Sequence, residues 1–126
     1  PHATSTLIGD AVELDALRSV FGAQLLLIAA TKGLTGHSIA AVNAQEAIFS
    51  SLMMQHGFVA AAANFNEVDP GYQEMPIVRQ PLAREITTVM STSIGFGGNC
   101  SGFKSTTDIR ASRCSAGNYF TWWYRI

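Results

Sequence analysis

The sequence contains little charge, few cysteines and no long apolar run. Only 13% of its 126 residues are charged and the formal net charge is -1, so no basic surface indicates a nucleic-acid partner. The longest apolar run, residues 25–30, is far too short to cross a bilayer. No positively charged start precedes an apolar stretch, and we therefore predict no signal peptide.

Metal-binding and disulfide patterns are also missing. The two cysteines, Cys100 and Cys114, form no CxxC pair, and the three histidines have no zinc spacing. We therefore expect no metal site and a reduced, cytoplasmic setting.

What the sequence does have is apolar residues, which make up 48% of the chain. That content excludes a disordered chain, and the low charge does not suit a small domain with a large exposed surface. The length fits one domain or part of one. Because Pro1 is not a natural start, we interpret the chain as a segment from the inside of a larger protein.

The pattern of helices and strands predicts an α/β protein. Asp10 followed by Glu13 has the spacing of a capping box, and Gly22 is a natural stop, so we predict a helix over residues 10–21. Strands are expected at 25–30, 58–65, 85–93 and 99–104, turns at 31–36 and 95–98, and a surface loop over 66–81.

Residues 37–56 predict a helix that is apolar on nearly every side. Its polar residues Asn43, Glu46 and Ser50 form one narrow stripe. Such a helix is usually buried between two layers, and a chain of this length has little material to cover both sides. We therefore expect a missing partner segment and concentration-dependent association of the isolated chain.

The first candidate site combines His2 with Thr4 and Thr6. A loop histidine with two hydroxyls close in sequence can present an imidazole and hydrogen-bond donors to one ligand. An ordinary polar loop explains the same residues.

The second candidate is Lys32 with His37, in TKGLTGHS. His37 precedes the predicted buried helix, where the partial positive charge of the helix start disfavours imidazolium. A neutral imidazole can donate a hydrogen bond to a carbonyl oxygen that gains negative charge. A capping histidine and a solvated lysine are the alternatives. Glu46 either pairs with Lys32 or lies on a solvated stripe.

Two further residues lie around the predicted turn at 95–98. Phe96, in GFGG, could act as a gate on a mobile turn, although a simple hairpin turn has the same composition. Cys100 could be a nucleophile, but a small buried cysteine in a strand is the more common situation.

Together, HATST, TKGLTGHS, QEAIFSSLM, NFNEVDPG and TTVMSTSIGFGGN occur in one order over about His2 to Asn99. This order resembles the C-terminal half of the elongating β-ketoacyl-acyl-carrier-protein synthases that use two active-site histidines. The resemblance implies a partial thiolase-like fold, one incomplete half of a five-layer αβαβα architecture. It also implies decarboxylative condensation of malonyl-acyl carrier protein with an acyl thioester in fatty acid biosynthesis.

The resemblance assigns catalytic roles to three residues. His2 and His37 match the two family histidines, which help to decarboxylate the malonyl group and stabilise the enolate oxygen. Lys32 matches the family lysine, and Glu46 matches the glutamate that accompanies it.

Three other residues match substrate-binding positions. Thr4 and Thr6 match positions that hold the phosphopantetheine arm, and Phe96 matches the gate of the acyl pocket. No cofactor is implied, because acyl carrier protein, the expected partner, brings the arm. A homodimer is expected at full length.

The family nucleophile, a cysteine, belongs to the N-terminal half, so the resemblance implies that this chain alone is inactive. Ala40 and Asn43 replace usual glycines, and Ile94 replaces a common aromatic residue. We assign residues 1–104 to a partial C-terminal synthase domain. Residues 105–126 are a tail unlike the family, as in a frameshifted or artificial end. The alternative function is a non-catalytic, ketosynthase-like partner subunit.

Overall fold

The computed structural model describes residues 1–22, 26–106 and 122–125. The chain forms two compact units, each built from separate stretches of sequence. Unit 1 contains Pro1–Ser38 and Val59–Leu82, and unit 2 contains Ile39–Phe58 and Ala83–Ile126. Both helices and strands are present, which confirms the expected mixed α/β class. The sequence predicted a division of the chain into a synthase domain, residues 1–104, and a tail unlike the family, residues 105–126. This division stays a prediction.

The first helix, α1, spans Leu7–Phe21 and is capped at its end by Gly22. The predicted stop is confirmed, since the Gly22 N–H donates to the Arg18 carbonyl at 2.8 Å. The predicted start at Asp10 is wrong. Thr6 is the N-cap, and Asp10 already lies inside the helix, with its N–H donating to the Thr6 carbonyl at 3.0 Å.

Unit 1 has a small apolar core around paired backbone segments. Ile28 makes a single parallel bridge with Ile77, so within its described part the predicted strand at 25–30 is reduced to one paired residue. The Val78 N–H donates to the Ile28 carbonyl at 2.9 Å, and the Ala62 N–H donates to the Val78 carbonyl at 2.7 Å. The buried apolar residues of unit 1 are Ile28, Val59, Ala62 and Val78.

A short helix, α2, spans Lys32–Thr35, where the sequence predicted only a turn. The N–H groups of Thr35 and Gly36 donate to the carbonyls of Thr31 and Lys32, at 3.2 and 2.9 Å, which closes one helical turn. Gly36 then adopts a φ of 70°, a left-handed conformation that glycine tolerates at a helix end.

The predicted helix at 37–56 begins later than expected. A 3₁₀ turn covers Ile39–Ala41, and α3 spans Val42–His56. Ile39 has a φ of 52°, and this left-handed conformation of a β-branched residue cannot belong to a right-handed helix. The predicted end is confirmed, since Gly57 caps α3 with a φ of 66°.

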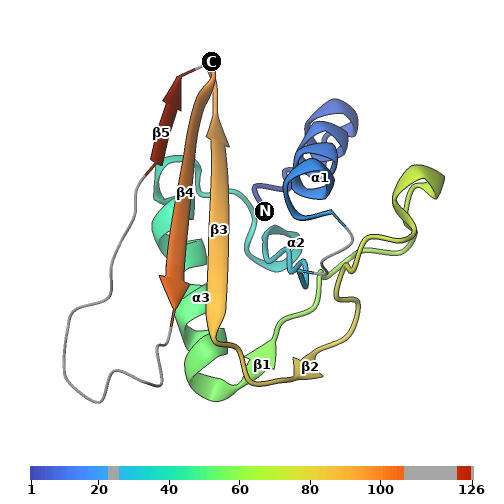
Figure 1. Ribbon diagram of the computed structural model, residues 1–126, viewed down its shortest axis with the longest axis vertical. Coiled ribbons are helices and arrows are strands. Elements are labelled where there is room, and N and C mark those ends of the chain that lie inside the picture. The colour runs from blue at the N-terminus through green and yellow to red at the C-terminus, as the bar shows by residue number, and fades with distance from the viewer. Residues whose placement is uncertain (23–25, 107–121, 126) are drawn as a thin grey trace. The chain divides into compact units, whose positions relative to one another are not determined.

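The apolar helix α3 is covered only in part within the described chain, as expected from the little material available to cover both of its sides. Within unit 2, α3 packs against β3 (Figure 1), and its buried residues are Val42, Glu46 and Met53. Ile48 and Leu52 remain 57% and 42% exposed. One layer therefore covers one face of the helix, and the expected association of the chain stays a prediction.

Two short strands, β1 (Phe58–Val59) and β2 (Leu82–Ala83), form a two-stranded sheet. The predicted strand at 58–65 is longer than the observed one. The chain turns at residues 63–64, where Asn64 has a φ of 59°. The predicted loop at 66–81 contains a 3₁₀ turn, η2, over Pro70–Tyr72.

The second sheet has the antiparallel order β3-β4-β5. Its strands are β3 (Thr88–Gly95), β4 (Asn99–Thr106) and β5 (Trp122–Arg125). Gly97 and Gly98 have φ values of 80° and 79°, which confirms the predicted tight turn. The described part of the predicted tail therefore joins this sheet through backbone pairing (Figure 1).

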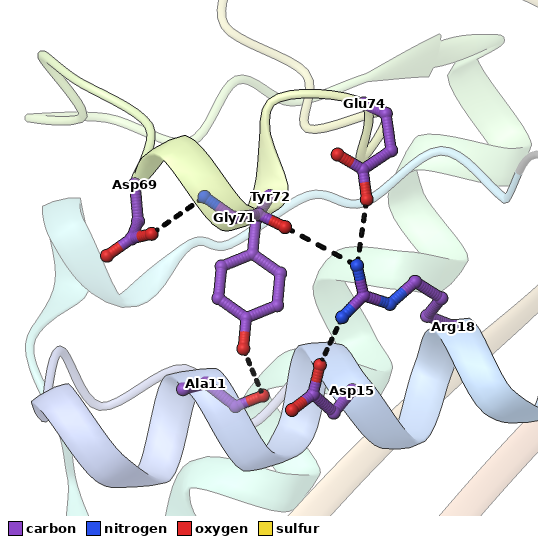
Figure 2. Close-up of polar contacts among 7 residues, drawn as sticks. All are labelled: Ala11, Asp15, Arg18, Asp69, Gly71, Tyr72 and Glu74. Atoms are coloured by element: carbon purple, nitrogen blue, oxygen red, sulfur yellow. Dashed lines mark hydrogen bonds and ion pairs between the residues drawn. The ribbon is translucent and has the colours of Figure 1, made fainter.

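Arg18 connects α1 to the η2 segment within unit 1 (Figure 2). Its guanidinium donates to Asp15 at 2.5 Å and to Glu74 at 2.9 Å. The same group lies over the Tyr72 ring, 5.3 Å from the ring centroid. The Tyr72 hydroxyl donates to the Ala11 carbonyl at 3.2 Å. We call Asp15, Arg18, Tyr72 and Glu74 the Arg18 cluster.

The Arg18 cluster predicts a loss of stability at high pH. Burial raises the pKa of Tyr72, and the charge of Asp15 raises it further. A raised pKa means that the phenol stabilises the fold fully below its unfolded pKa of about 10, and that this contribution is lost as pH rises through the folded pKa. Urea unfolding gives the free energy of unfolding at each pH. Between neutral and strongly alkaline pH, this free energy should therefore fall less in Tyr72→Phe than in the parent chain. Equal losses in both chains would contradict this.

Candidate functional site

The structure brings His2 and His37 together within unit 1. Their ring centroids lie 5.3 Å apart, and the ring planes meet at 86° in an edge-to-face contact. His2 is half-buried and His37 is exposed. Two imidazoles that are distant in sequence thus lie side by side, as the candidate site required.

The His2 segment is held by a buried carboxylate on α1. Glu13, which is 6% exposed, accepts hydrogen bonds from the backbone N–H groups of His2 at 2.7 Å and Ala3 at 2.9 Å. Asp10 accepts a further bond from the Ser5 N–H at 3.1 Å. Ala3 and Ser5 have φ values of 38° and 62°, which are unfavourable for side chains with a Cβ and persist only when neighbours hold them.

Sequence reasoning missed this role of Glu13. The spacing of Asp10 and Glu13 correctly indicated a carboxylate that reaches back to a backbone N–H. The capping-box interpretation chose the wrong partner, because α1 begins earlier than predicted and the N–H groups that Glu13 accepts from lie in the preceding loop. The available signal was the pair of acidic residues, Asp10 and Glu13, that follows the candidate catalytic loop.

Lys32 is the first residue of α2, in the same unit as the two histidines. The side-chain amide of Asn64 donates to the Gly33 carbonyl at 2.8 Å, which fastens this short helix to the segment after β1. Asn64 is a second positioning residue that the sequence did not reveal.

Thr4 and Thr6 lie in the segment between His2 and α1. Thr4 is half-buried and Thr6 is exposed. Thr6 provides the carbonyl that starts α1, and its side chain makes no capping hydrogen bond. The proposed role of the Thr4 and Thr6 hydroxyls in holding a substrate arm stays a prediction.

The remaining predicted residues belong to unit 2. Glu46 lies on α3 and is 8% exposed, so the solvated-stripe interpretation is wrong. Its pairing with Lys32 stays a prediction, because the two residues belong to different units. Phe96 lies at the fully exposed tip of the β3–β4 hairpin, and its gating role also stays a prediction. Cys100 is a half-buried free thiol in β4.

In the part of the chain that the structure describes, no three histidine, cysteine, aspartate or glutamate side chains gather closely enough to hold a metal ion. Among the same residues, no helix has both the length and the apolar character needed to cross a membrane.

Residues 1–66 match the family described as "Beta-ketoacyl synthase, C-terminal domain". The chain is 52% identical over 97 residues to 3-oxoacyl-[acyl-carrier-protein] synthase 1 of Escherichia coli, which covers 77% of this chain and 24% of that protein. It is 44% identical over 105 residues to the mitochondrial 3-oxoacyl-[acyl-carrier-protein] synthase of Arabidopsis thaliana, covering 77% and 22% of the two chains. The identity to 3-oxoacyl-[acyl-carrier-protein] synthase 2 of Staphylococcus aureus is 37% over 100 residues, covering 78% and 24%.

The chain thus spans about a quarter of the length of these curated relatives. The matched part includes the paired histidines of unit 1, and the expected family is confirmed. The chain belongs to the β-ketoacyl synthase family, through the C-terminal domain of that family.

Proposed function

We propose that this chain supplies the two-histidine part of a 3-oxoacyl-acyl-carrier-protein synthase. The complete enzyme would condense malonyl-acyl carrier protein with an acyl thioester, with loss of CO₂, in fatty acid biosynthesis. One observation carries the proposal, which is the edge-to-face contact of His2 and His37 at 5.3 Å. The names of the relatives, 3-oxoacyl-[acyl-carrier-protein] synthases, support the substrate class.

The spacing of the rings suits two donors to one oxygen. An oxygen placed along an N–H direction of both rings, about 4 Å from each centroid, would lie about 2.8 Å from a ring nitrogen of each residue, within hydrogen-bonding distance. When the malonyl carboxylate leaves as CO₂, the electron pair of the broken C–C bond moves into the thioester as an enolate. The two N–H groups would then stabilise the negative oxygen, an interaction that strengthens as charge develops.

Other residues of the chain have supporting roles in this proposal. Lys32, paired with Glu46, would orient the malonyl group, and Thr4 and Thr6 would hold the pantetheine arm. Phe96 would gate the acyl pocket from its hairpin tip. The near-complete burial of Glu46 supports a paired role, since a buried carboxylate without a partner is costly.

The proposal extends to the whole protein. We infer a thiolase-like αβαβα architecture, of which this chain forms an incomplete half, and a homodimer at full length. Acyl carrier protein is the proposed partner and the compartment is the cytoplasm. The nucleophilic cysteine would come from the part of the synthase that precedes these residues.

A chimera tests the proposal directly. The matched 97-residue segment of the Escherichia coli relative is replaced by the corresponding residues of this chain, and the purified chimera is assayed with malonyl- and acyl-acyl carrier protein. We expect release of CO₂ and formation of the 3-oxoacyl product. A folded chimera that releases no CO₂ would contradict the proposal.

A further inference from the structure

The helix that holds the His2 segment, α1, has no fully buried apolar side chain. Among its residues only Glu13 is buried. The apolar side chains that it exposes are Leu7, Ile8, Val12 and Val20, which are 96%, 79%, 60% and 73% exposed. Leu14, Leu17 and Phe21 on the same helix are half-buried, so hydrophobic burial positions α1 only in part, and polar contacts add to it.

The Arg18 cluster provides those contacts (Figure 2). One guanidinium bonds Asp15 on its own helix and Glu74 on the η2 segment, and it also donates to the Gly71 carbonyl at 3.4 Å. The Tyr72 ring lies against the same cation. An arginine guanidinium is charged throughout the physiological range, and the hydrogen bonds to Asp15 and Glu74 raise the pKa of Arg18 further.

The residues that follow η2 are in turn bonded to Ile28, which precedes α2 and His37 in the sequence. The Ile28 N–H donates to the Pro76 carbonyl at 3.0 Å, and the Val78 N–H donates back to the Ile28 carbonyl at 2.9 Å. Thr31 and α2 follow Ile28 closely in sequence, and His37 comes directly after Gly36. A continuous path thus runs from His2 through Glu13 and α1, across Arg18 to Glu74, and through Ile28 to His37.

We propose that Arg18 is a positioning residue for the His2–His37 pair, because it fixes α1 and its attached His2 segment against the segment that leads to His37. The catalytic importance of this role rests on the proposed function, but the geometric role does not. The Arg18 side chain is 44% exposed, and exposed ion pairs are individually weak. The expected effect is therefore on the spacing of the imidazoles more than on global stability.

The test is an NMR measurement on the complete 126-residue chain with labelled histidines. In the parent chain, the ring protons of His2 and His37 should show a nuclear Overhauser cross-peak, while His56 serves as an internal reference. We expect Arg18→Ala to lose this cross-peak with a small change in melting temperature, and Arg18→Lys to retain part of it. Arg79→Ala is the matched control, because Arg79 lies over the Phe65 ring at 5.8 Å in the same unit.

Glu74→Gln gives a second, milder variant, since it weakens the contact across segments and leaves the Asp15 pair in place. If Arg18→Ala does not fold, loss of the His2–His37 cross-peak in Glu74→Gln supports the positioning role, and an unchanged cross-peak contradicts it. An unchanged cross-peak in both variants would overturn the proposal, and so would an equal loss in Arg79→Ala. If the cross-peak depends on Arg18 but the chimera releases no CO₂, the proposed function fails and the positioning role stands.

Discussion

In the chimera, His37→Ala should lower the rate of malonyl decarboxylation by about 10²–10³-fold, the usual cost of removing one donor to a developing oxyanion. His37 is exposed and contacts the half-buried His2 at its ring edge. Because the bond to the enolate oxygen strengthens only as charge develops, kcat should fall while KM for malonyl-acyl carrier protein changes little.

His56→Ala is the matched control for this prediction. His56 is an exposed histidine at the end of α3, in the other unit. Its replacement should leave the decarboxylation rate close to that of the parent chimera. A His37→Ala chimera that is as fast as the His56→Ala control would remove His37 from the mechanism.

Glu13→Ala should destabilise the chain by about 3 kcal/mol or more, since hydrogen bonds to a charged group contribute about 1.5–3 kcal/mol each. Two such bonds join Glu13 to the His2 and Ala3 amides. Urea unfolding measures the loss of stability. Hydrogen exchange at the two amides measures the local release of the His2 segment, which should be larger than the change elsewhere.

Glu67→Ala is a suitable control, since Glu67 is an exposed glutamate in the same unit. Glu13→Gln should give an intermediate loss, because its amide keeps one acceptor oxygen. If the His2 and Ala3 amides exchange no faster in Glu13→Ala than in the parent chain, the carboxylate does not hold the segment.

The ends of helices were predictable where glycine determines them. Gly22 and Gly57 both terminate helices where expected, because a left-handed or otherwise unusual conformation costs glycine little. The helix starts were not predictable from the same pattern. A threonine backbone carbonyl begins α1 without a side-chain cap, and the conformation of Ile39 separates His37 from α3.

The strands were less predictable than the helices. The predicted strand at 58–65 became the short β1, because tertiary context places a left-handed residue at Asn64. The hairpin of β3 and β4 was predicted more accurately, since the β-branched residues of its first strand are followed by a glycine pair. Its first strand lies slightly later in the sequence than expected.

The order of the sequence motifs predicted which histidines form the site, but it did not predict the contacts that hold them in place. HATST and TKGLTGHS identified His2 and His37 as a pair, and the structure places their rings in contact. The supports from Asn64 and Arg18 depend on contacts between distant segments. Such contacts carry no local periodicity, so a single sequence could not indicate them.

The most direct test of shared action by the two histidines is a double-variant cycle in the chimera. Decarboxylation rates are measured for His2→Ala, His37→Ala and the double variant. If both imidazoles serve one enolate oxygen, the double variant should be about as slow as the slower single variant, as for residues that act as a unit. Rate losses that multiply would show that the histidines act independently, and would contradict this account.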